Sequence, residues 1–345
     1  MYKKFFMGIA AMAALTLVSC SSDDLNSLSD NSSKNEAISF DGYWGRSAVS
    51  VNGSRGSAID KAEDLQTVTE GFGVFGNYSS TDGTTPTYGE NWFKNRQVTY
   101  KTSAWTYSPL KYWLPEGHID FLAYAPYAKN TALTDSKINF TVADQVGNQK
   151  DLLWANATNK KKADKTVTFT FNHALAKIGY TVKTNVDDKG GTTITLNKIT
   201  LAGSEDGTSN APFYTSGTID LSKTTGAPDL WTNLQGKQKF TWFDGTQKLT
   251  STSASNPKTD YLFVIPQDFS DATSDDLYVI VNYTINYNTG ETKTMTNWVS
   301  SKIEKKFEQG KAYKINLSVG LTPIEFNAEV NEWKDGEKID DITWE

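Results

Sequence analysis

The stretch Thr166-Val-Thr-Phe-Thr-Phe-Asn-His173 alternates polar and apolar side chains residue by residue. Successive side chains of a β-strand point to opposite faces, so this pattern predicts a strand with one face on a core and one toward solvent. The same period of two recurs along the chain, for example in Ile119–Phe121, Ile138–Val142, Ile178–Val182 and Tyr313–Val319. We therefore expect an all-β fold.

Short strands separated by Gly, Asn, Asp and Ser, without a convincing amphipathic helix, predict antiparallel β-sandwiches. The roughly 300 residues that follow the N-terminal segment exceed one sandwich of ordinary size, so two tandem domains are expected. The least apolar interval near the middle is Lys183–Thr192. It predicts an N-terminal sandwich over residues 37–185 and a C-terminal sandwich with a tail over residues 186–345.

Three local patterns add detail to this expectation. Asn288-Thr-Gly290 predicts a hairpin turn between two strands. The continuous apolar run Tyr261–Ile265 is typical of a strand buried on both faces, and Asp60–Val68 has room for one or two helical turns.

Composition limits the class of function. Aromatic residues make up 12% of the 345 residues, which is typical of globular chains and too rich for a disordered one. The formal charge of −6 comes without a concentrated basic stretch, so a nucleic-acid partner is not expected. The single cysteine rules out an intramolecular disulfide.

That cysteine, Cys20, follows a leader-like segment. Met1-Tyr-Lys-Lys4 is cationic and Phe5–Val18 is apolar but short for a membrane span, which predicts an export signal over residues 1–19. Leu17-Val-Ser-Cys20 resembles the bacterial lipobox, which implies a diacylglycerol on the Cys20 sulfur, an anchor in the outer membrane and a flexible tether over residues 20–36. The alternative is an ordinary secretory signal with an incidental cysteine.

The residues that carry catalysis are few. His118 and His173 are the two histidines, and neither has a partner at metal-ligand spacing. No nucleophile elbow, phosphate-binding glycine loop or calcium loop occurs, and the acidic pairs Asp187-Asp188 and Asp275-Asp276 are expected to be solvated loop charges. We therefore expect no enzyme, no metal and no cofactor.

The aromatic segments Trp105–Trp113 and Trp242–Phe243 have two interpretations. Their rings suit stacking on sugars, which would make the chain a surface-exposed glycan-binding lipoprotein, or they fill sandwich cores and rims. A lipid-anchored hydrolase is a third alternative, which would need adjacent carboxylates in a cleft.

Four segments resemble a known family. They are Trp105–Pro115, His118–Tyr127, Thr166–Ile178 and the closing Gly310-Lys-Ala-Tyr-Lys-Ile-Asn-Leu-Ser-Val319. Together with the lipobox they are similar to Bacteroidales fimbrillin-like proteins, subunits of type V pili. The resemblance implies two tandem transthyretin-like sandwiches and a structural role in a fimbrium at the cell surface, in contact with other pilus subunits.

The resemblance also implies a processing step. In that family a surface trypsin-like protease cuts the lipidated precursor after an arginine in an early loop and removes the first strand. Here the candidate first strand carries Ile38 and Phe40, and the Gly/Ser-rich segment after it holds two arginines. Arg55 matches the implied position better, and Arg46 is the second choice.

The vacated groove would then accept a strand from another subunit, a form of β-augmentation. Two segments have suitable apolar spacing. One is Thr322–Val330, with Ile324, Phe326 and Val330, and the other is the tail, with Ile339, Ile342 and Trp344. The sequence leaves open which of them is donated.

Overall fold

The computed structural model describes residues 36–44, 59, 62–81, 83, 85–186, 190–209, 211–256, 261–271, 273–288, 292–321 and 325–332. These residues form an all-β fold, which confirms the expected fold class. The short helix α1 (Ala62–Thr67) lies within Asp60–Val68, and the turns η1 (Val146–Asn148) and η2 (Lys162–Asp164) are of the 3-10 type.

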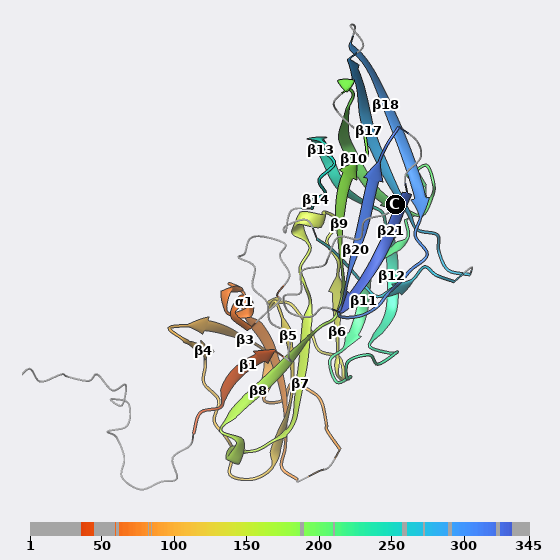
Figure 1. Cartoon of the computed structure of the whole chain (residues 1–345). Helices are drawn as coiled ribbons and strands as arrows, with labels where there is room; N and C mark the ends of the chain where they lie inside the picture. The colour runs from red at the N-terminus through yellow and green to blue at the C-terminus, as the bar shows by residue number, and fades with distance from the viewer. Residues whose placement is uncertain are drawn as a thin grey trace, which may run out of the picture. The chain divides into compact units, whose positions relative to one another are not determined.

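One sheet is built from seven strands in the order β1-β8-β7-β5-β2-β3-β4. The strands are β1 (Ser39–Trp44), β8 (Thr166–His173), β7 (Leu153–Lys160), β5 (His118–Ala125), β2 (Phe72–Ser79), β3 (Phe93–Lys101) and β4 (Ala104–Thr106). All neighbours are antiparallel except β1 and β8, which run parallel (Figure 1). The edge strands β1 and β4 also contact each other, so the sheet encloses a core.

The remaining strands form smaller sheets, which Figure 1 shows mostly in green to blue, with β6 in yellow. One contains β13 (Phe240–Lys248), β10 (Thr193–Ala202), β17 (Tyr278–Asn288) and β18 (Thr292–Lys302), and a second contains β12 (Trp231–Gln238), β11 (Phe213–Asp220) and β6 (Lys137–Thr141). A third contains β14 (Ala254–Ser255), β9 (Ala176–Thr184), β20 (Lys311–Val319) and β21 (Glu325–Glu332), with β15 (Leu262–Val264) on β9, and the last pairs β16 (Gln267–Asp268) with β19 (Lys306–Phe307).

The sheets do not divide at residue 185. β6 pairs with β11, and β9 pairs with β20, so two strands from before the expected boundary share sheets with strands after it. The polar interval Lys183–Thr192 covers the end of β9 and the approach to β10. Low apolar content therefore marks a connection between strands here, and a polar connection by itself does not separate two domains. The division into two domains stays a proposal.

The period-two pattern is confirmed where one face of a strand is covered. In β8, Val167, Phe169 and Phe171 are buried while the threonines between them are exposed. In β5 the expectation of one solvent face is wrong, because all eight residues are buried. Ile119 and Phe121 belong to one apolar core and Leu122 and Tyr124 to another, so β5 is a wall shared by both.

The hairpin and the buried strand are also confirmed. β17 and β18 pair antiparallel on either side of the predicted turn, from Tyr278 opposite Lys302 to Asn288 opposite Thr292. β15 lies within Tyr261–Ile265 and is fully buried.

Candidate functional site

The first strand, β1, is an edge strand whose side chains fill a core. It pairs in parallel with β8, from Ser39 opposite Thr166 to Trp44 opposite Phe171, and within the described residues no second strand hydrogen-bonds to its other side. Ile38 and Phe40 are only 1% and 5% exposed. This segment is therefore joined to the sheet by the β8 ladder and to the core by the side chains of Ile38 and Phe40.

Phe40 is at the centre of an aromatic cluster. Its ring centroid lies 5.3–6.5 Å from those of five other rings, contributed by Phe72, Phe93, Tyr107, Phe121 and Phe169. Edge-to-face and offset arrangements at these distances are favourable beyond the burial of area alone. Phe40 is therefore the main side chain that β1 contributes to the core.

The residue two positions after Phe40 is a glycine in a confined place. A methyl group on Gly42 would lie 3.4 Å from Leu65, 3.6 Å from Phe171 and 3.7 Å from Trp105, which are ordinary van der Waals distances. The core therefore has room for alanine at this position and little room for anything larger.

A second segment, residues 107–113, closes over the start of β1. The amide of Ile38 donates to the Lys111 carbonyl at 2.8 Å, and the Tyr107 hydroxyl donates to the Ile38 carbonyl at 2.7 Å. The Trp113 amide donates to the Glu36 carbonyl at 3.0 Å. Burial raises the pKa of the Tyr107 phenol, which keeps it a neutral donor. We call residues 107–113 the clasp.

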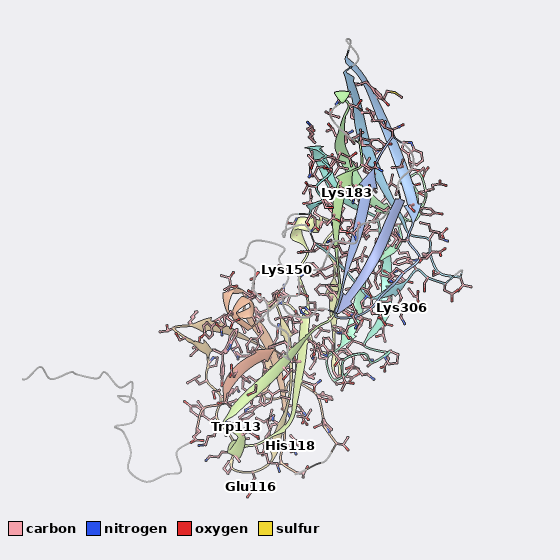
Figure 2. The ribbon with its side chains drawn as sticks, viewed as in Figure 1. Trp113, Glu116, His118, Lys150, Lys183 and Lys306 are labelled. Carbon is pink, nitrogen blue, oxygen red and sulfur yellow. The ribbon has the colours of Figure 1, made fainter. Side chains whose placement is uncertain are left out.

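The clasp accounts for an aromatic segment whose role the sequence left open. Trp113 is 2% exposed and its indole donates to the Lys165 carbonyl at 3.1 Å, at the start of β8 (Figure 2). Trp105 packs against Phe72, and Trp242 is 3% exposed. The indole faces of Trp113 and Trp242 are therefore covered by protein and are not available for stacking on a sugar.

The chain after the first strand is fixed again at Ile59. This residue is 5% exposed, and its amide donates to the Asp151 carboxylate at 3.0 Å. Arg46 and Arg55 lie between Trp44 and Ile59 in the sequence and are outside the described residues. Also outside the described residues are Cys20, Ile324, Ile339, Ile342 and Trp344. No local sequence pattern predicts the contact between Ile59 and Asp151, because the two residues are 92 positions apart.

The other candidate strand, β21, is at the edge of its own sheet. It pairs antiparallel with β20, with Phe326 opposite Leu317 and Val330 opposite Tyr313. The partners Leu317 and Tyr313 are buried. β1 and β21 are thus both edge strands, and they lie in different sheets.

Both histidines pair with a buried carboxylate. His118 Nε2 lies 3.3 Å from Asp120, which also accepts the Thr87 and Asn159 amides, and His173 Nδ1 lies 3.0 Å from Asp151. Within the described ranges no three His, Cys, Asp or Glu side chains gather as metal ligands would. In the same ranges, no helix has the length and apolar character that crossing a membrane requires.

Two further features lie at the surface, a set of ion pairs and a pocket. Asp275 pairs with Lys237, and Asp276 lies 2.9 Å from Lys302, so these carboxylates form exposed ion pairs. A pocket of about 740 Å³ opens at the end of β8, lined among others by Phe171, Trp231 and Lys306. Sequence reasoning did not predict this pocket, because its walls come from distant segments.

One family model matches most of the chain, and solved structures share its fold. The sequence model described as fimbrillin-like matches residues 61–333. A fimbrial protein from Bacteroides vulgatus is 18% identical with a TM-score of 0.66, and the match covers 87% of this chain and all (100%) of that one. A proposed cell adhesion protein from Bacteroides uniformis is 16% identical with a TM-score of 0.52, over 87% and 99% of the two chains. No curated protein matches the chain.

Proposed function

The chain belongs to the fimbrillin-like family, and we propose that it is a structural subunit of a pilus that polymerises by exchange of its first strand. The observation that carries this proposal is β1, an edge strand that pairs with a single strand, β8, while Phe40 within it and Ile38 just before it are buried in the core. The function of the chain would then be assembly into a pilus, with no catalytic site, cofactor or nucleic-acid partner.

The precursor is exported, acylated on Cys20 and anchored in the outer membrane, facing the cell surface. A trypsin-like surface protease then cuts after Arg55, or after Arg46 as second choice. Either cut falls between Trp44 and Ile59 and separates β1 from the rest of its sheet. The cut also frees the subunit from its lipid.

Loss of β1 leaves a groove that needs a new occupant. Burial of Ile38 and Phe40 stabilises the fold by about 1.5–3 kcal/mol each, so their removal takes away about 3–6 kcal/mol. That is a large share of the ~5–15 kcal/mol that holds a typical domain together. The unpaired edge of β8 and the opened aromatic core therefore favour capture of another strand.

The sequence of β21 and the residues before it matches β1 in spacing. Ile324-Glu-Phe-Asn-Ala328 repeats the order of Ile38-Ser-Phe-Asp-Gly42, with a small residue at the fifth position. The space at Gly42 admits a methyl group, so alanine fits there. The tail has a different spacing, with Ile339 and Ile342 three positions apart. We favour donation of the segment Ile324–Val330, with the tail as the alternative donor.

Donation from one subunit to the groove of the next joins two different surfaces. Such a head-to-tail contact does not close on itself and so propagates a fibre. The donated strand binds through main-chain hydrogen bonds and alternate side chains, which is the physics of β-augmentation.

The proposal is tested with purified precursor lacking residues 1–20 and a low dose of trypsin. The expected product begins at Gly56 and moves from monomer to polymer on size-exclusion chromatography. Arg46→Gln should behave as the parent does, and the double variant Arg46→Gln/Arg55→Gln should remain uncut in this segment and monomeric. A clipped product that stays monomeric would contradict the proposal, as would polymer formed by the uncut double variant.

A further inference from the structure

A buried carboxylate connects three segments of the chain. Asp151 is 2% exposed, and its two oxygens lie 3.1 and 3.0 Å from His173 Nδ1. One of them also accepts the Ile59 amide at 3.0 Å. Hydrogen bonds to an ionised carboxylate in a buried place are among the stronger ones in proteins.

The position of this cluster relates it to the first strand. β8 lies beside β1 as far as Phe171, opposite Trp44, and two residues later it presents His173 to Asp151. Ile59 lies in the same apolar core as Ile38 and Phe40. The structure therefore fixes the chain on both sides of the segment that holds Arg46 and Arg55, by pairing with β8 before it and by Asp151 after it.

Lys150, the residue before Asp151, provides a second attachment for this part of the chain. Lys150 pairs with Glu70 at 2.7 Å, and the hydrogen bond and charge of Lys150 lower the pKa of Glu70 (Lys150 is labelled in Figure 2). Glu70 follows α1, and Ile59 precedes it. Lys150 and Asp151 thus hold the chain on both sides of α1.

We propose that Asp151, held in place by His173, is the anchor that keeps the chain downstream of the processing cut in the fold. This inference rests on the proposed function. Cleavage then releases β1 while Ile59 stays in the core. The groove opens along β8, and the protease does not cut the subunit further. Asp151 acts here as a positioning residue for the segment that the protease leaves behind.

The chain provides a sharp readout for this anchor. After Arg55 the next basic residue is Lys61, and the one after that is Lys94. An anchored Ile59 predicts a clipped product that begins at Gly56 and resists a further cut. A detached Ile59 predicts a second cut after Lys61, giving a product that begins at Ala62.

The experiment compares Asp151→Ala and Asp151→Asn with the parent and with Asp144→Ala, an exposed carboxylate in the preceding loop. Asp151→Ala should shift the product from Gly56 to Ala62, Asp144→Ala should not, and Asp151→Asn should lie between, because its amide oxygen still accepts a hydrogen bond. Sequencing of the clipped N-terminus reports the result. A product of Asp151→Ala that still begins at Gly56 overturns the inference.

A second pair of variants separates the hydrogen bond from the side chain. Ile59→Pro removes the backbone N–H donor and Ile59→Ala keeps it, while both variants lose the isoleucine side chain. Cleavage after Lys61 should be more extensive for Ile59→Pro than for Ile59→Ala. Equal cleavage in the two variants overturns the role of the hydrogen bond from the Ile59 amide to Asp151.

Hydrogen exchange of the uncut protein tests the anchor without proteolysis. Loss of one bond to a buried carboxylate should speed exchange of the Ile59 amide by about ten- to a hundredfold in Asp151→Ala, with strands β10 and β17 unchanged. Unchanged exchange at Ile59 overturns the anchor, whereas failure of the parent to polymerise after a clean cut would count against the proposed function alone.

Discussion

At the scale of single residues, Phe40 is the side chain on which the account depends most. It touches five aromatic rings from strands β2, β3, β5 and β8 and from the clasp. Its position in the chain, only a few residues after a polar segment, gives no hint of such a central place. The alternation Ile38-Ser-Phe40 does predict that its side chain points inward.

Phe40→Ala should destabilise the uncut precursor by about 3–5 kcal/mol, because a buried ring is lost and a cavity is left among the others. Urea unfolding of the precursor measures this loss. Leu110→Ala, which truncates a side chain 53% exposed on the clasp, is the control and should change stability by less than about 0.5 kcal/mol. A Phe40→Ala precursor as stable as the control would show that β1 does not support the core.

Tyr107 gives the clasp a pH dependence. Burial raises its pKa above the ordinary value of 10.0, whereas in the unfolded chain the phenol titrates near that value. Above a pH of about 10 the unfolded state therefore binds fewer protons than the folded state, so stability is full below that pH and falls as the pH rises further.

The alkaline loss of stability should be shallower in Tyr107→Phe, which cannot ionise at this position. Buried Tyr124 and Tyr313, whose pKa values burial also raises, keep part of the decline in both proteins. Urea unfolding between pH 8 and pH 11 measures the slopes. Equal slopes in the two proteins would mean that Tyr107 leaves the clasp before it ionises.

At the scale of strands, the sequence predicts β8 as a strand but does not predict that β1 pairs with it in parallel. Period-two patterns located β8 and β20 because each strand carries its own alternation, and the turn signal Asn288-Thr-Gly290 located the β17–β18 hairpin. The parallel neighbour of β1, the shared wall β5 and the link between Ile59 and Asp151 depend on residues far apart in the chain. No local pattern encodes such contacts.

The exchange of strands is tested with synthetic peptides. A peptide of residues 322–332 should bind the clipped subunit and block its polymerisation, because its Ile-x-Phe-x-Ala spacing matches the Ile-x-Phe-x-Gly spacing of the first strand. The same peptide with Phe326→Ala should bind at least about tenfold more weakly, since one buried ring is lost. A tail peptide of residues 336–345 is the matched comparison, and stronger binding by it would identify the tail as the donor.

Ala328, the small residue of the proposed donated segment, provides a second check on the register. Ala328→Trp in the donated segment should prevent polymerisation of clipped protein, because the place of Gly42 has room for little more than a methyl group. Gly42→Ala in the precursor should change stability by less than about 1 kcal/mol. Light scattering follows the polymer, and normal polymerisation of Ala328→Trp would exclude the proposed register.

At the scale of the whole molecule, the proposed function gives lipid and strand successive roles. A lipid on Cys20 would hold the precursor at the membrane while β1 completes its sheet, and one cut would remove both. Cys20→Ala should therefore lose membrane retention in cells, and a palmitate analogue should no longer label the protein. Continued labelling of Cys20→Ala would place the lipid elsewhere.

The central claim is that β1 is a temporary occupant of its groove. The most direct test is the N-terminal residue of the subunit in fibres isolated from intact cells, read by sequencing or mass spectrometry. The account predicts that subunits within fibres begin at Gly56 and contain none of residues 20–55. Fibres whose subunits still begin with acylated Cys20, with Ile38 and Phe40 present, would contradict it.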